Sequence, residues 1–315
     1  MAESHARLAR IFARINHADL PALSAHVQEI LSMIDSRRAT AEALSEIILK
    51  DFSLTNKIFQ IVNSPYYRRT TPISSISRAV ATLGFNPVRD LAIAVGVFED
   101  FLKAGLEKES ISKLLAKSFV SAELARAICF SKKLIMSAEE AYICSLLHSL
   151  GRIIILVYLP DLYREIEKRT AEGEPEGEAA RMVLEGLAFH EVGQEIAKFW
   201  NFPGKIIATM TEKPRKPRDR NDAEALLEVL VVFCNRLVRM VCQEDDISRL
   251  VETYGRILGV SLAEIVELSL ASVEKIGEIA PIFRFGLVRL KLRSKLLYME
   301  RGLLDQGGYH IKPFS

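Results

Sequence analysis

Apolar residues recur with the 3.6-residue period of an α-helix along most of this chain, whereas strict alternation of apolar and polar residues is nearly absent. An early example is the face formed by Val27, Ile30, Leu31 and Ile34. Helices with such faces bury their apolar side chains against one another, and strands would need the period of two that is missing here. The sequence therefore predicts an all-α fold.

Start and stop signals divide this pattern into separate helices. Ser137 and Glu140 form a capping box, Thr40 is a second predicted N-cap, and Gly84 ends a short helix. Residues 172–178, rich in Glu and Gly, are predicted to form an acidic surface loop or a weak helix start. Helices are predicted over residues 76–83, 88–102, 114–130, 179–187, 190–200, 223–241, 247–258, 262–276 and 285–298, after three earlier ones, and over the segment from Ser137 to His148.

The composition is that of a folded soluble protein. The chain has 315 residues, of which 49% are hydrophobic and 26% are charged, enough for one large or two ordinary domains. The formal net charge is only +2, so the overall charge favours neither a nucleic acid nor an anionic membrane as partner.

The four cysteines indicate a reducing compartment. Cys129, Cys144, Cys234 and Cys242 lie in apolar segments without a C-x-x-C pair, so we expect buried thiols and neither disulfides nor a zinc site. No signal peptide is recognised, and the most apolar run, Ile153–Leu159, is too short to span a bilayer. These features predict a cytoplasmic protein without a membrane partner.

One stretch, residues 145–151, joins two strongly apolar helical segments through the pair His148-Ser149. A His followed by a carboxylate at the end of a buried helix would indicate a metal-dependent phosphohydrolase, because both side chains could bind one cation. The second residue here is Ser149, whose neutral hydroxyl is a poor ligand for a hard divalent metal. We therefore expect no metal ion and no other cofactor.

Several short motifs follow one another in a fixed order over about two thirds of the chain. The first group comprises LPAL (20–23), DFSLT (51–55), VNSPYY (62–67), ISSISRAV (73–80) and LGFNPV (83–88). The second comprises LLHSLG (146–151), HEVG (190–193) and WNFP (200–203). With these motifs the chain resembles the HDOD domain, a bacterial signalling module related in sequence to the HD and HD-GYP phosphohydrolases.

The resemblance implies an N-terminal helical bundle lobe packed on a degenerate HD-like helical lobe, with extra C-terminal helices. We expect the N-terminal lobe to span residues 1–108 and the HD-like lobe residues 109–213. A C-terminal helical extension is expected over residues 222–303.

The departures from the HD enzymes bear most on function. The resemblance places a first metal-binding His near Lys117, the paired Asp at Ser149, and a later His-His pair within residues 211–214, where no His occurs. Metal-dependent hydrolysis needs three or more N or O ligands around the cation and an open position for water. Only His148 and His190 remain in this lobe, so we expect a protein that is not an enzyme.

Four residues are candidates for a residual pocket: Lys117, His148, Ser149 and His190. Each histidine also has a purely structural interpretation. His148 would bond to a backbone carbonyl in the core, and His190 would cap its helix or pack beside His148. If both rings face one cavity, Lys117 offers a charge and Ser149 a donor for an anion. No catalytic and no metal-binding residue is assigned.

Two other functions are alternatives to this non-enzymatic role. A divergent metal-dependent phosphohydrolase would use His148 and His190 with carboxylates such as Glu185 or Glu191. A helix-turn-helix DNA-binding regulator would use the helix that starts at Leu54, but this helix carries one basic residue only. No Gly-x-Ser-x-Gly motif supports a serine nucleophile, and the basic segments 213–220 and 289–295 are typical of solvated faces.

The sequence therefore favours a non-catalytic bacterial signal-transduction or scaffold protein that acts by protein–protein interaction. Its expected partner is a protein of a signalling pathway, with a nucleotide second messenger as a further candidate ligand. Nucleic acid is not favoured. Leu290 and Leu297, seven residues apart, are compatible with a homodimer seam, although Leu287 and Leu292 could equally pack inward.

Overall fold

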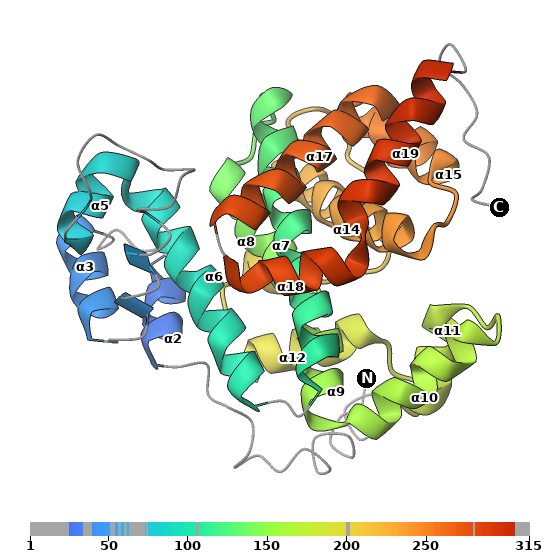
Figure 1. The fold of residues 1–315 in the computed structure, drawn as a ribbon, viewed down its shortest axis with the longest axis horizontal. Coiled ribbons are helices and arrows are strands. Elements are labelled where there is room, and N and C mark those ends of the chain that lie inside the picture. Colours follow the sequence, from blue (N-terminus) through green and yellow to red (C-terminus); the bar gives the residue numbers. More distant parts are fainter. Residues whose placement is uncertain are drawn as a thin grey trace.

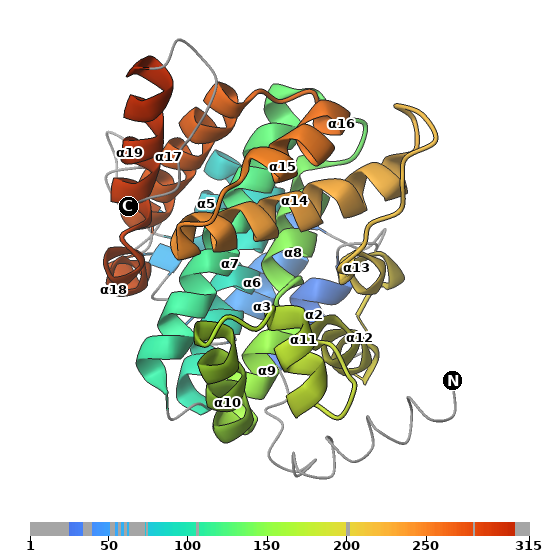
Figure 2. The ribbon, with the colours of Figure 1, turned by 90° about the vertical axis from the view of Figure 1, so that its right-hand side faces the viewer.

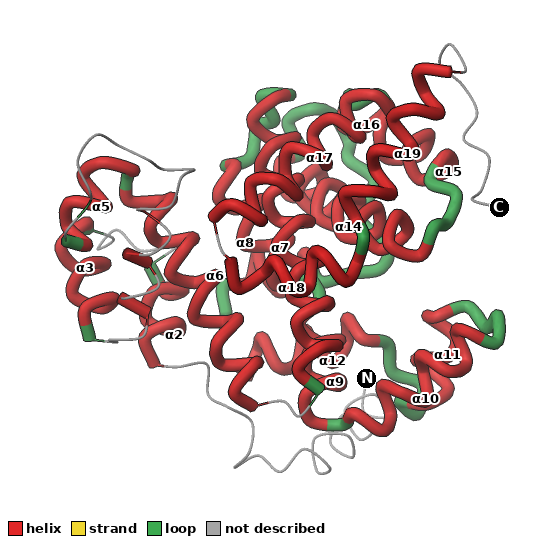
Figure 3. The backbone as a smooth tube through the Cα atoms, viewed as in Figure 1, coloured by secondary structure: helices red, strands yellow, loops and turns green. Residues whose placement is uncertain are grey.

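The computed structural model describes residues 25–33, 40–50, 54–55, 58–59, 62, 73, 75–104, 107–199, 202–279 and 281–305. Within these ranges the chain consists of helices joined by turns and short connections, and none of these residues belongs to a strand (Figure 3). The predicted all-α fold is confirmed.

The N-terminal helices form a group at the left of Figure 1, and the longest of them, α6, connects this group to the rest of the molecule. Thr40 and Ser75 cap two of them, each accepting a hydrogen bond from a backbone N–H three residues later. The helices are α2 (Ala25–Ser32), α3 (Ala41–Leu49), α5 (Ile76–Leu83) and α6 (Phe85–Ala104). Half of the helix proposed for DNA binding, including Asn56, Lys57 and Gln60, lies outside the described residues.

A long buried helix, α7, is the centre of the second group and packs against α6, α8, α9, α14, α17 and α18. The helices α10 and α11 pack against each other at the lower right of Figure 1. The helices of this group are α7 (Lys108–Ser131), α8 (Ala138–Leu147), α9 (Leu150–Tyr158), α10 (Pro160–Ala171), α11 (Glu176–Val183), α12 (Phe189–Phe199) and α13 (Gly204–Thr209).

Two glycines let the backbones of α9 and α12 touch. A Cβ atom added at Gly151 would lie 1.9 Å from the carbonyl oxygen of Phe189, and one added at Gly193 would lie 2.9 Å from the amide nitrogen of Gly151. No side chain fits at such distances, so only glycine allows this crossing. The crossing holds the His148 turn next to the first turn of α12.

The C-terminal helices pack back on the central helix. Figure 2 shows α14 crossing α7 and α8, and α14 also packs against α19. The helices are α14 (Ala223–Gln243), α15 (Ser248–Leu250), the π-helical turn η2 (Val251–Gly255), α16 (Arg256–Leu258), α17 (Leu262–Ile279), α18 (Pro281–Leu290) and α19 (Leu292–Asp305). The domain boundaries expected from the sequence stay a prediction.

The single helix predicted over residues 285–298 is two helices. The chain turns at Lys291, whose φ of 51° lies in the left-handed region, where an α-helix ends. Leu287, Leu290 and Leu292 are all buried, because the turn at Lys291 lets both α18 and α19 pack against the core of the protein. Leu290 is therefore not available for a dimer seam, and a homodimer stays a prediction.

One apolar stretch, Glu140–Tyr158, is long and apolar enough to cross a membrane by length and composition. Of that stretch 78% is buried inside the fold, as in the core helix of a globular protein. All four cysteines are free thiols, and Cys129, Cys144 and Cys234 are buried. The cytoplasmic location stays a prediction.

Candidate functional site

A cavity of about 600 Å³ lies between α7, α9, α10, α11, α12 and α14. Its wall is rich in ionisable side chains: Lys117, Arg152, Arg236, Arg239, Glu167, Glu176, Glu212, His148 and His190. The volume is in the range of pockets that bind small organic ligands. All four residues that the sequence nominated, Lys117, His148, Ser149 and His190, line this one cavity.

Lys117 belongs to a helical stripe of α7, with Leu114 and Ser121 at spacings of three and four residues. Burial lowers the pKa of the Lys117 ammonium, and the nearby cations Arg152 and Arg239 lower it further, against the opposing effects of Cys242 and Glu176. Among the residues that the structure describes, Lys117 has no hydrogen-bond acceptor and no carboxylate oxygen within 4.0 Å.

His148 lies in the turn between α8 and α9, with Nε2 3.2 Å from the carbonyl oxygen of Thr211. Burial lowers the pKa of His148 to about 4, and the bond to the carbonyl offsets only part of this effect. The ring is therefore neutral at pH 7, and because a carbonyl can only accept, Nε2 carries the proton. This is the carbonyl bond of the structural interpretation, in a ring that also faces the cavity.

Ser149 follows in the same turn and faces α14. Its hydroxyl lies 3.5 Å from Oδ1 of Asn235, whose Nδ2 donates to the carbonyl oxygen and the hydroxyl of Ser145 at 3.1 and 2.9 Å. Asn235 thus ties the His148 turn to the C-terminal helices. The hydroxyl that replaces the HD carboxylate takes part in this structural link.

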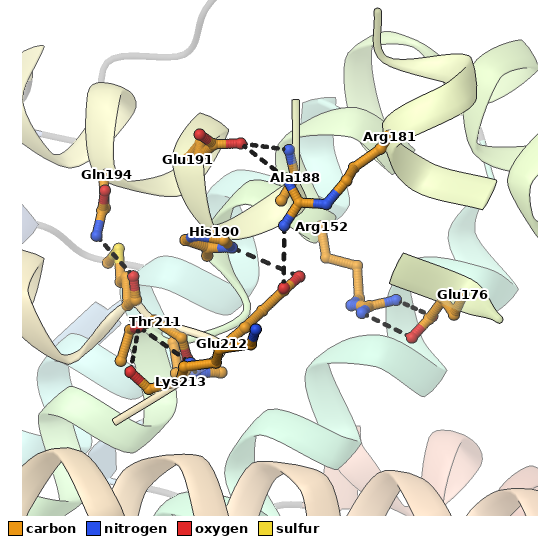
Figure 4. A network of polar contacts seen from close by, with 12 residues as sticks. Arg152, Glu176, Arg181, Ala188, His190, Glu191, Gln194, Thr211, Glu212 and Lys213 are labelled. Carbon is orange, nitrogen blue, oxygen red and sulfur yellow. Dashed lines mark hydrogen bonds and ion pairs between the residues drawn. The ribbon is translucent and has the colours of Figure 1, made fainter. Parts of the chain in front are cut away.

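His190 lies in the first turn of α12 and faces Glu212 (Figure 4). Its Nδ1 is 3.5 Å from Oε1 of Glu212, and Nη2 of Arg181 is 3.2 Å from Oε2. The His190 ring and Arg181 together lower the pKa of Glu212 to about 2, although burial opposes them. From α14, Arg236 Nη2 donates to the backbone carbonyl of Glu212 at 2.6 Å.

A shared carboxylate joins two arginines at the end of the cavity formed by α9, α11 and α14. Glu176 accepts two hydrogen bonds from Arg152 and one from Arg239 Nη1 at 2.8 Å (Figure 4 shows the bonds from Arg152). Burial alone would raise the pKa of Glu176, but the two guanidinium groups outweigh it and lower the pKa to about 2. Arg152 also stacks on Phe189, 4.3 Å from the ring centroid.

Glu176 agrees with the helix start that was one of the two alternatives predicted for residues 172–178. It starts α11, and its side chain is only 22% exposed, so this part of the acidic segment faces the cavity and not the solvent. The reason is that α11 packs against α10, which brings the first turn of α11 within reach of Arg152 and Arg239.

Sequence reasoning missed the arginines as well. Arg236, Arg239 and Gln243 are spaced by three and four residues in an otherwise apolar helix, which places them on one face. Arg152 directly precedes the most apolar run of the chain, and a charge next to such a run needs a partner where it is buried. Both signals are visible in the sequence, but neither says that the two segments meet.

These residues do not fit the metal site of the HD enzymes. The described part of the chain contains no group of three or more His, Cys, Asp or Glu side chains that could hold a metal ion. The ammonium of Lys117 would repel a cation, and Glu212 is already bound to Arg181. The carboxylates named for the enzyme alternative do not line the cavity, since Glu191 accepts from the Ala188 amide at 2.7 Å and Glu185 lies in the turn after α11.

Some side chains of the two basic segments are paired within the chain. Arg215 binds Glu228 at 2.7 Å, and Arg293 and Lys295 bind Glu274 and Glu244 at 3.2 and 3.1 Å. These contacts agree with the interpretation of both segments as solvated faces.

Comparison with solved structures shows the same fold in three bacterial proteins. An HDOD domain protein of unknown function from Geobacter sulfurreducens has a TM-score of 0.65 at 21% identity, with 97% of this chain and 99% of the other covered. A protein of Shewanella amazonensis SB2B, provisionally named a phosphohydrolase, has a TM-score of 0.61 at 18% identity, with 86% and 93% covered. One of Marinobacter aquaeolei VT8, provisionally named a signal transduction protein, has a TM-score of 0.62 at 14% identity, with 92% and 66% covered.

Sequence comparison adds a curated relative and a family. An uncharacterised protein of Treponema pallidum (strain Nichols) is 23% identical over 243 residues, which are 76% of this chain. The matched region is 46% of that protein, so the chain spans about half the length of this relative. The model of the HDOD domain matches residues 20–215, well over half of the chain. The motifs, the helical fold and this match agree: the chain belongs to the HDOD family.

Proposed function

We propose that this protein is a non-catalytic signalling protein that acts by contact with a partner protein. One observation carries the proposal: the cavity at the His148 turn presents an ammonium, a hydroxyl and a paired carboxylate where an HD enzyme needs metal ligands. These groups belong to Lys117, Ser149 and Glu212. A site of this kind can bind a ligand but cannot gather the three or more donors that activate a metal-bound water.

The connections of the cavity support a role in signalling. Its wall includes both the HD-like helices and α14, which packs on α7, α8 and α19. A change at the cavity would therefore reach the C-terminal helices through packed side chains and through Asn235, Arg236 and Arg239. We propose that a partner protein recognises the position of these C-terminal helices.

The non-catalytic part of the proposal is tested by metal content and turnover together. The chain would be produced in medium supplemented with iron, manganese and zinc and purified without a metal-binding tag. We expect less than about a tenth of an equivalent of any of these metals, because a structural or catalytic site binds its metal nearly stoichiometrically. We also expect no hydrolysis of bis-p-nitrophenyl phosphate.

Turnover that disappears in His148→Ala would contradict the proposal and place the phosphohydrolase alternative first. Turnover that is unchanged in that variant would point to a contaminating enzyme. For the partner, affinity capture from native lysate that recovers no protein above background would count against a scaffold role.

A further inference from the structure

We infer that the cavity binds a small phosphorylated molecule of about nucleotide size, whose phosphate is held by Lys117 of α7 together with Arg236 and Arg239 of α14. The inference goes beyond the signalling role proposed above, because it names the chemistry of a ligand and does not depend on whether a partner protein exists. It rests on charge, on free donors and on the size of the cavity.

The charges of the cavity do not balance. In the described part of the chain, neither Lys117 nor Arg236 has a carboxylate oxygen within 4.0 Å, and Arg236 only donates to the neutral carbonyl of Glu212. Arg152 and Arg239 share the single carboxylate of Glu176 and so keep one positive charge between them. Glu167 also lines the cavity, but its carboxylate lies more than 4.0 Å from the Lys117 ammonium.

Cations that are withdrawn from water without a partner lower the stability of a fold. A ligand that supplies the missing negative charge removes this cost. A phosphate monoester carries about −1.5 to −2 charges and three acceptor oxygens. It can therefore neutralise two cations at once, whereas a single carboxylate neutralises one.

The donors are available on two helices that touch. Lys117 has three N–H donors without an acceptor in the described structure, and Arg239 uses only Nη1 for Glu176. Their helices, α7 and α14, pack against each other along the cavity. Guanidinium groups match the geometry of phosphate oxygens, and an ammonium acts as a point charge beside them.

The cavity is larger than a phosphate group requires. Its volume of about 600 Å³ lies within the roughly 300–1,000 Å³ of pockets that bind small organic molecules. The remaining space is bordered by the rings of Phe189 and Tyr163, whose centroids are 6.2 Å apart, and by the amide of Gln243. Apolar ring edges with an amide beside them suit an organic group attached to the phosphate, such as the nucleoside part of a nucleotide.

The test is calorimetric titration of the full chain with defined probes at low salt. The phosphate probes are inorganic phosphate, pyrophosphate, AMP, GMP and cyclic di-GMP, and citrate is the carboxylate control. We expect one-to-one binding of at least one nucleotide with a Kd below about 100 µM. Inorganic phosphate should bind more weakly, because it fills only part of the cavity.

Two variants assign the site. Lys117→Met removes the charge at similar length, and Arg236→Gln keeps a donor for the Glu212 carbonyl; each should weaken binding about tenfold or more. The matched control is Lys113→Met, one turn earlier on the same helix, where the ammonium is paired with Glu109 at 2.9 Å and does not line the cavity. The control should bind as the wild type does.

Several results would overturn the inference. These are no heat of binding for any phosphate probe at millimolar concentration, citrate binding as tightly as the best nucleotide, or equal losses in Lys117→Met and Lys113→Met. Binding of a phosphoserine peptide in place of every small molecule would also overturn it. Phosphorus NMR of the bound probe separates this inference from the function proposed above, because binding with turnover would contradict only the non-catalytic role.

Discussion

Two charged clusters lie on opposite sides of α7, and each consists of one glutamate shared by two cations. On one side Glu123 binds Arg126 and Lys275, and on the other side Glu176 binds Arg152 and Arg239. In each, an arginine stacks on an aromatic ring: Arg126 on Tyr142 at 4.8 Å and Arg152 on Phe189 at 4.3 Å. We call them the Glu123 cluster and the Glu176 cluster.

The two clusters differ in what surrounds them. The side chain of Glu123 is 5% exposed between α7, α8 and α17, whereas that of Glu176 is 22% exposed and lines the cavity beside Lys117 and Arg236. The same arrangement of charges therefore holds packed helices together in the Glu123 cluster and forms part of a pocket in the Glu176 cluster. What makes a site is the open volume and the unbalanced charge beside it, and not the ion pairs themselves.

The largest effect is expected when the close crossing of α9 and α12, which positions Arg152 of the Glu176 cluster, is disrupted. In Gly151→Ala the new Cβ would meet the Phe189 carbonyl oxygen, so α9 and α12 must separate and carry Arg152 away from its ring. We expect a loss of about 3 kcal/mol or more in the free energy of unfolding, as in severe overpacking. Urea denaturation measures it.

The matched control is Gly204→Ala, since nothing lies within 4 Å of a Cβ at that position. The control should stay within about 1 kcal/mol of the wild type. If both variants lose the same stability, the close crossing of α9 and α12 is not what requires glycine at residue 151.

The second effect concerns pH, because the cavity contains a half-buried histidine that is neutral at pH 7. With the pKa of His148 lowered from 6.5 to about 4, the unfolded chain binds more protons than the folded one between these values. Stability is therefore full above about pH 6.5 and falls as the pH drops through 4, by roughly 3 kcal/mol for this one group.

Denaturation at pH 7, 5.5 and 4 in the wild type and in His148→Gln measures this contribution, since the amide can still donate to Thr211. We expect a smaller loss between pH 6.5 and 4 in the variant. The carboxyls of Glu176 and Glu212, with pKa values of about 2, stay charged over most of this range and lose their contribution only below about pH 4.5. Identical pH profiles would show that His148 is not buried in the neutral form.

A third test compares the two clusters directly. Glu176→Gln and Glu123→Gln each leave two cations without their carboxylate, and each should destabilise the fold by about 2 kcal/mol. Pyrophosphate should restore part of the stability of Glu176→Gln, because the anion can enter the cavity, but not that of Glu123→Gln. Thermal unfolding with and without 5 mM pyrophosphate measures the difference. Equal rescue of both variants would remove the distinction between them.

The smallest expected effect is on the stability of Lys117→Met. Replacing a largely buried, unpaired ammonium with an apolar side chain of similar length should leave stability unchanged or raise it by up to about 1 kcal/mol. Thermal unfolding without ligand measures it. A clear loss of stability would mean that Lys117 has a structural role, contrary to its position at the cavity.

The sequence by itself determined the helical class and the family. The period of 3.6 residues is a local property, so it was visible without any knowledge of the fold, and the capping residues Thr40 and Ser75 show how local signals fix helix starts. The four nominated pocket residues were likewise found from motifs, and the structure places all of them at one cavity.

Only the tertiary structure decided what else surrounds those four residues. Arg236 and Arg239 follow the HDOD match of residues 20–215, and Glu176 lies in a segment predicted as an acidic surface loop or a weak helix start, neither of which indicates a cavity. The left-handed turn at Lys291 was equally hidden, because no Gly or Pro marks it. Helical periodicity predicts which face of a helix is buried but not which helices pack against that face. The charge balance of the cavity, on which its proposed ligand depends, is set by which helices pack around it.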